Sequence, residues 1–145
     1  MKKLLLGILI SLFMVTIAYG ECVQTIQAKN NLNVMKFAWT TVATGSFTTT
    51  TSNMPVDGYI VMIETVPSST AAPTDDYDIT LNNDDGYEVT GGNLANRDTA
   101  NTEVVMPLLN SEIVRFPNFG ALTLAITNAG ANKSGVVNVY YEWNR

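Results

Sequence analysis

The clearest β-strand pattern in the chain is Leu122-Thr-Leu-Ala-Ile-Thr127, followed after a polar loop by Val137-Asn-Val-Tyr-Tyr-Glu-Trp143. Along most of both runs, large apolar residues alternate with polar or small ones. Successive side chains of a strand point to opposite faces of its sheet, so this alternation indicates strands with one buried face. The loop Asn128–Gly135 joins them. The C-terminal part of the chain is therefore predicted to be a pair of half-buried strands.

Strand signals of the same kind recur towards the N-terminus. The run Tyr59–Val66 is apolar on both faces, which is typical of a central strand. Tyr77–Leu81 alternates, and the turn Asn82–Gly86 leads into Tyr87–Val89 as a hairpin. Further strands are predicted at Met35–Val42, at Phe47–Thr51 as a solvated edge, and at Glu103–Leu108 and Glu112–Phe116, each beside a proline.

These signals amount to about eight or nine short strands, with no convincing amphipathic helix after residue 20. Such a series is typical of a sandwich or a barrel. The predicted fold is all-β, an antiparallel β-sandwich of Ig-like or jelly-roll-like kind. Three segments are expected: a signal peptide at 1–20, an N-terminal arm or edge strand at 21–34, and the β-sandwich domain at 35–145.

The first twenty residues have the layout of a secretory signal peptide. Lys2 and Lys3 precede the apolar run Leu4–Ala18, and Ala18-Tyr-Gly20 offers small residues for cleavage after Gly20. The run is short for a bilayer span, which needs roughly 20 residues, although an uncleaved membrane anchor is the alternative. The protein is therefore expected to be exported, to the periplasm or the extracellular space, with a virion surface as a further candidate location.

The charge balance argues against nucleic acid as a partner. Eight basic residues stand against thirteen acidic ones, a net charge of −5. Loss of Lys2 and Lys3 with the signal would leave six basic residues and a charge of −7. An acidic chain without a basic cluster repels phosphate backbones, and it has no polybasic patch for a membrane surface. No nucleic acid and, after signal cleavage, no membrane is expected as a partner.

Histidine is absent, and Cys22 is the only cysteine. A Ser-His or Cys-His nucleophile is therefore excluded, and no glycine-rich phosphate loop stands between a strand and a helix. The chain is not expected to be an enzyme. A single cysteine cannot form an intrachain disulfide. Cys22 is a candidate for an interchain disulfide, and the alternative is an inert thiol near the terminus.

Five aspartates are candidates for a calcium site, since hard cations bind clustered carboxylate oxygens. They are Asp75, Asp76, Asp78, Asp84 and Asp85. Their spacing does not match an EF-hand loop, so such a site would have to join the loop before Asp78 to the turn Asn82–Gly86. The alternative is that they are turn formers and solubilising charges at strand ends, with no cofactor bound.

Tyr140 is the candidate ligand-binding residue. Most aromatic residues alternate in step with the expected core, but Tyr140 shares a face with Asn138 and Glu142. An exposed tyrosine on a sheet face could contact a carbohydrate. The alternative is that it is buried packing.

A series of short motifs is similar to one found in small proteins encoded by tailed bacteriophages. The motifs are Ala72-Pro-Thr-Asp-Asp-Tyr-Asp-Ile-Thr-Leu81, Asp84-Asp-Gly86, Gly91-Gly-Asn-Leu-Ala-Asn-Arg-Asp98, Thr102-Glu103, Gly120-Ala-Leu-Thr-Leu124 and Ser134-Gly-Val-Val-Asn-Val-Tyr140. The resemblance covers about Val56 to Tyr141, and the proteins it points to are virion-associated. It implies a structural or surface-decorating role and no catalytic residues.

Two functions are therefore open. The first is a non-catalytic structural or decorating subunit of a phage virion or extracellular assembly, whose partners are copies of itself or other subunits. In it, the segment 21–34 could pair with a neighbour's sheet edge. The second is a secreted module that binds a carbohydrate or cell-surface ligand through the loops Pro67–Asp76 and Asn93–Asn101. An acid-dependent hydrolase is the third candidate and the least favoured, because the chain has no histidine and no cleft is expected.

Overall fold

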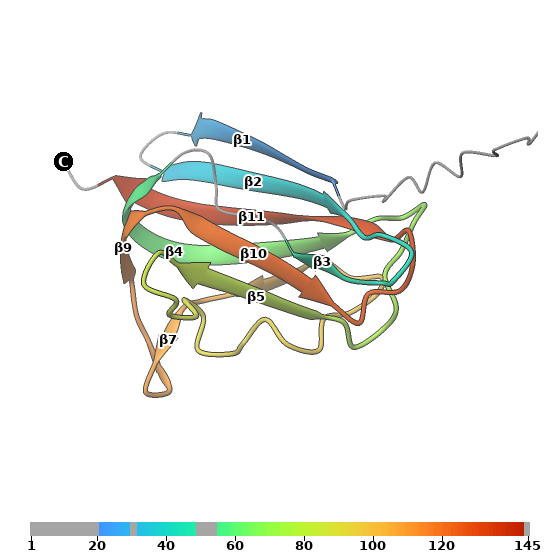
Figure 1. Ribbon diagram of the computed structural model, residues 1–145. Coiled ribbons are helices and arrows are strands. Elements are labelled where there is room, and N and C mark those ends of the chain that lie inside the picture. The colour runs from blue at the N-terminus through green and yellow to red at the C-terminus, as the bar shows by residue number, and fades with distance from the viewer. Residues whose placement is uncertain (1–20, 30–31, 49–54, 144–145) are drawn as a thin grey trace, which may run out of the picture.

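Two antiparallel β-sheets stack face to face in this protein (Figure 1). The computed structural model describes residues 21–29, 32–48 and 55–143, and within these ranges it contains eleven strands and no helix. The prediction of an all-β antiparallel β-sandwich is confirmed. The predicted signal peptide, residues 1–20, lies outside the described residues.

The larger sheet has six strands. In order across it they are β1 (Glu21–Lys29), β2 (Leu32–Thr40), β11 (Ser134–Trp143), β4 (Val56–Pro67), and then β6 (Glu103–Val105) and β9 (Phe116–Gly120), which share the far edge of β4. As predicted, β4 lies inside the sheet. A bulge at Val61 shifts its register with β11, where Tyr140 faces Met62 but Tyr141 faces Ile60.

The smaller sheet has three strands, and a separate two-stranded hairpin lies apart from both sheets. Across the smaller sheet the strands are β3 (Phe47–Thr48), β10 (Leu122–Thr127) and β5 (Asp78–Asn83). The hairpin consists of β7 (Leu108–Leu109) and β8 (Glu112–Ile113). The predicted segment Glu103–Leu108 contains β6 and the first residue of β7, and Glu112–Phe116 contains β8 and the first residue of β9.

The core lies between the two sheets, and the described ranges contribute twenty buried apolar residues to it. The alternation predicted for the C-terminal strands is confirmed, because Leu122, Leu124 and Ile126 are buried along β10, as are Val137, Val139 and Tyr141 along β11. From β5, Ile79 and Leu81 complete the inner face of the smaller sheet. Without an intrachain disulfide, this apolar burial is the main source of stability.

Although they are consecutive, β10 and β11 do not pair with each other; they belong to opposite sheets. The loop between them crosses the sandwich and is held at both sides. Thr41, buried directly after β2, donates from its hydroxyl to Gly130 O (2.7 Å) and accepts from Lys133 N (2.9 Å). On the other side, Asn128 Nδ2 donates to Asp78 Oδ2 (2.8 Å).

The N-terminal segment is an edge strand and not a free arm. All nine residues of β1 pair with β2, from Glu21 opposite Thr40 to Lys29 opposite Leu32. Residues 32–34, predicted as part of the arm, belong to β2. The predicted edge at Phe47–Thr51 is confirmed as far as Thr48, where the described residues end, but Phe47 is buried rather than solvated. No helix in the described ranges is long and apolar enough to cross a membrane.

Gly135 is required for the packing of Trp39. The Trp39 side chain is buried and lies beneath Gly135, its partner on the neighbouring strand. A Cβ at Gly135 would be 2.7 Å from Trp39 Cζ2 and 3.0 Å from Val66 O. Neither neighbour can move easily, since one is a buried ring and the other is backbone.

We expect Gly135→Val to lower the free energy of unfolding by about 2 kcal/mol, since the added side chain overpacks the core. Urea unfolding followed by tryptophan fluorescence measures this. Gly92→Asn is the matched control, because a Cβ there meets nothing within 4 Å and asparagine tolerates its positive φ. Equal stabilities for the two variants would contradict the packing described for Trp39.

Candidate interaction surfaces

The structure does not bring together the five aspartates predicted as calcium candidates. Asp75 and Asp76 precede β5, whereas Asp84 and Asp85 follow it, so the length of a six-residue strand separates the two groups. At about 3.4 Å per residue, this is on the order of 17 Å. Among the described residues, no group of three or more Asp, Glu, His or Cys could hold a metal ion.

Acidic side chains instead hold loops to the sandwich. Asp78 Oδ1 accepts from Asn96 N (3.0 Å), and Asp84 Oδ2 accepts from Ala121 N (3.1 Å). Asp98 accepts hydrogen bonds from the backbone N–H groups of Ala100 and Asn101 and from the side-chain amide of Asn101. These bonds, the one from the Asn101 side chain most of all, lower the pKa of the Asp98 carboxyl. Loop N–H groups outside sheets need such acceptors, which these carboxylates provide.

Tyr140 lies on the outer face of the six-stranded sheet, on the central strand β11, and is partly exposed. Its hydroxyl donates to Glu64 Oε2 (3.1 Å), and Asn138 Nδ2 donates to the same oxygen (2.8 Å). Burial and then the Glu64 carboxylate raise the pKa of the phenol. The predicted ligand-binding tyrosine is thus tied into a polar cluster with Glu64 and Asn138 and is not a free aromatic platform.

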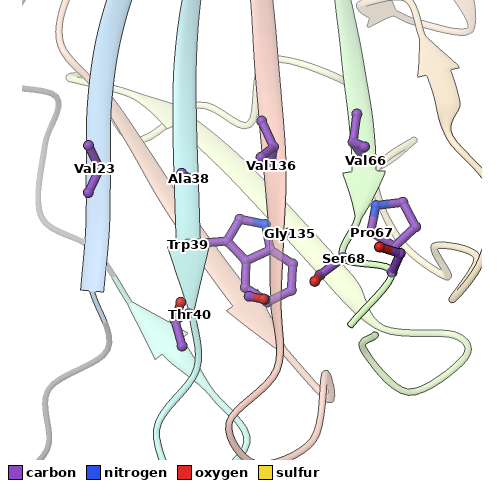
Figure 2. Close-up of a pocket in the computed structure, with 11 residues that line it drawn as sticks. Val23, Ala38, Trp39, Thr40, Val66, Pro67, Ser68, Gly135 and Val136 are labelled. Carbon is purple, nitrogen blue, oxygen red and sulfur yellow. The ribbon is translucent and has the colours of Figure 1, made fainter. Parts of the chain in front are cut away.

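Beside this cluster, a shallow groove of about 490 Å³ crosses the outer face of the sheet (Figure 2). Four aliphatic residues on adjacent strands form its central row: Val23, Ala38, Val136 and Val66. The small side chain of Ala38, in the middle of this row, contributes to the depression. Its walls offer aliphatic side chains and the hydroxyls of Thr40, Ser68, Ser69 and Ser134.

Cys22 stands on β1 opposite Trp39 and is partly buried against the core. Burial raises the pKa of its thiol to about 11. Because the thiolate is the reactive form, Cys22 is poorly suited to disulfide exchange at neutral pH. The predicted interchain disulfide stays a prediction that this environment does not favour.

The largest concentration of exposed apolar side chains was not predicted from the sequence. Four residues at β6 and the β7–β8 hairpin form it, and we call them the hairpin patch: Val104 (55% exposed), Met106 (46%), Leu109 (58%) and Ile113 (68%). The hairpin projects from the sandwich in Figure 1. The other four large exposed apolar residues of the described ranges, Val23, Tyr87, Phe119 and Trp143, lie on four different segments.

A signal for the hairpin patch exists in the run Val104-Val-Met-Pro-Leu-Leu109. Its apolar residues occupy both alternation phases, so an edge strand built from it must expose some of them.

Comparison of the chain with models of protein families, with curated proteins and with solved structures found no match.

Replacing Glu64 with glutamine should lower the pKa of Tyr140 towards that of an ordinary tyrosine. The carboxylate opposes a negative phenolate, and a neutral amide does not. An NMR titration of tyrosine ring signals measures the change, with Tyr140→Phe identifying the signal. An unchanged pKa in Glu64→Gln would contradict the contact.

Cys22 should react with iodoacetamide at neutral pH about 100-fold more slowly in the folded protein than in urea. The reason is the small thiolate fraction of a thiol whose pKa is raised to about 11. Mass spectrometry of quenched samples follows the reaction. Equal rates in the folded and unfolded states would show that the thiol is not protected.

Proposed function

We propose that this chain is a non-catalytic structural or surface-decorating subunit of an assembly, either a phage virion or an extracellular structure. The observation that carries the proposal is the hairpin patch. Four large apolar side chains are each about half exposed or more: Val104, Met106 and Ile113 lie around one hollow between β6 and the hairpin, and Leu109 lies on the other face of the hairpin. Contiguous apolar patches of a few hundred Å² on a soluble protein mark contacts with other molecules.

The electrostatics of the chain support the same proposal. The net charge of −5 makes copies repel each other over most of their surface. The apolar side chains of the hairpin patch carry no charge. A subunit that must stay soluble before assembly and then bind through one defined place needs this combination.

The sheet edges also suit an assembly subunit. The six-stranded sheet ends in β1 on one side and in β6 and β9 on the other. Sheet edges carry unpaired backbone donors and acceptors, and strand addition uses them to join chains. The Ala72–Tyr140 motifs that resemble those of virion-associated phage proteins point in the same direction.

A secreted binding module is the second candidate, and the groove of Figure 2 favours it. The two loops predicted as its contact surface lie together, since Thr99 donates from its hydroxyl to Pro73 O and from its backbone N to Asp75 Oδ1. The groove, however, offers aliphatic side chains and hydroxyl groups, and its one aromatic residue, Trp39, is buried. Sugars are bound mainly by stacking on exposed aromatic rings, so we rank this function below assembly.

Native mass spectrometry of the full chain, expressed in a bacterial host and recovered from the exported fraction, tests the proposal. We expect a defined multimer that persists in reductant, because apolar contacts and not Cys22 hold it. A protein that stays monomeric from micromolar to near-millimolar concentration, also when mixed with other virion proteins, would refute the assembly role. Saturable glycan binding by that monomer would establish the second candidate.

A further inference from the structure

We infer that Met106 is a redox-sensitive modification site, at which a peroxide converts the thioether to a sulfoxide and so weakens the contact that the hairpin patch makes. The weakening of the contact rests on the proposed function. The oxidation itself depends only on the environment of the Met106 side chain.

Met106 is the most accessible methionine of the described residues. It is 46% exposed, whereas Met35 is fully buried in the core and Met62, on β4, is partly buried. The other methionines of the chain, Met1, Met14 and Met54, lie outside the described residues. A peroxide must reach the sulfur atom to react with it, so oxidation follows exposure. Among the described methionines, Met106 is therefore expected to react first.

The thioether of Met106 is presented on a backbone that the fold holds in place. The residues on either side of it, Val105 and Pro107, are both buried. Pro107 O accepts a hydrogen bond from Val114 N (3.0 Å). Met106 itself lies at the hollow of about 390 Å³ between β6 and the β7–β8 hairpin. Its exposure therefore belongs to the folded protein and does not require a local opening.

The one cysteine of the chain competes poorly for a peroxide. Cysteine is oxidised through its thiolate. Cys22 is partly buried against the core, and burial raises the pKa of its thiol to about 11. Little thiolate is present at neutral pH as a result. A thioether has no proton to lose before it reacts, so Met106 carries no such restriction.

The step is the transfer of one oxygen atom from hydrogen peroxide. The sulfur lone pair of Met106 attacks one peroxide oxygen, so that a sulfur–oxygen bond forms as the oxygen–oxygen bond breaks. The sulfur is oxidised by two electrons. The second peroxide oxygen is reduced, takes the proton of the transferred oxygen and leaves as water. The products are a sulfoxide and water, and no cofactor is needed.

A sulfoxide at this position changes the hairpin patch more than the fold. Oxidation turns a flexible apolar side chain into a polar one. Met106 is not part of the core, and Asn93 and Arg97 already make one side of its hollow polar, so the sandwich stays folded. In a contact, however, the new oxygen would lose water beside Val104 and Ile113. Removing a polar group from water without a matching partner costs free energy, so the contact weakens.

The first test is the oxidation rate of each methionine in folded protein from the exported fraction, in dilute hydrogen peroxide at neutral pH. Peptide mapping by mass spectrometry resolves the sites. We expect Met106 to react at least about tenfold faster than Met35, since a core thioether reacts only in rarely populated open states. The same two rates in urea are the internal control and should be similar. Similar rates in the folded protein would overturn the modification site.

The second test is the dissociation constant of the multimer, measured by sedimentation before and after peroxide treatment. We expect oxidation to raise it about tenfold, because the sulfoxide oxygen must be desolvated. Met106→Leu keeps the apolar side chain without the sulfur, so its association should match the wild type and resist peroxide. Met106→Gln places a polar group of similar length there and should imitate the oxidised protein. Circular dichroism and urea midpoints confirm that each sample is folded.

The outcomes separate this inference from the assembly role. Rapid oxidation of Met106 with an unchanged dissociation constant would overturn the redox control and leave the assembly role standing. So would a peroxide effect that persists in Met106→Leu. A wild-type protein that never associates with itself or with other subunits would overturn the assembly role and the redox control together, and the oxidation rates would still decide the modification.

Discussion

Burial of one face of the six-stranded sheet beneath a sheet of only three strands is the contact on which this structure depends. Strands lie about 4.8 Å apart, so three of them cannot cover the width of the larger sheet. Side chains from connecting segments complete the core, among them Tyr77, Val89, Leu94 and Ala129. The smaller sheet covers least of β1, which forms the edge opposite β6 and β9. Cys22 and Ile26 on β1 are therefore only partly buried.

The unequal sheets also explain where the acidic residues are used. Segments that cover a core without forming strands leave backbone N–H groups unpaired, and each must find an acceptor. Asp78, Asp84, Asp98 and Glu88 accept such bonds around the smaller sheet. Three of the aspartates that look like cation ligands in the sequence, Asp75, Asp78 and Asp84, therefore accept bonds from loop N–H groups, and the strand β5 separates Asp75 from Asp84.

The features of this structure that bear on function lie on its surface, on the outer face of the larger sheet and at the β7–β8 hairpin. The outer face of the larger sheet is divided between the Tyr140–Glu64–Asn138 cluster and an aliphatic row, and its side chains are mostly half-buried by their neighbours. The β7–β8 hairpin differs because it is too small to bury either of its own faces. A two-stranded hairpin standing alone is marginally stable at best, and the exposed apolar residues on its faces are the observation on which the proposed assembly role rests.

The sequence was sufficient for the fold class, the central position of β4 and the buried faces of β5, β10 and β11, because a two-residue alternation assigns each side chain to a face wherever the strand lies. It could not assign partners. Alternation is the same whether β10 pairs with β11 or, as here, faces it from the opposite sheet, and whether the first strand is a free arm or pairs with β2. Tyr140 was placed on the outer face, but its bond to Glu64 joins residues 76 positions apart. The hairpin patch likewise arises only when β6 and the β7–β8 hairpin come together, because exposure depends on what the rest of the chain covers, and that is a property of tertiary packing.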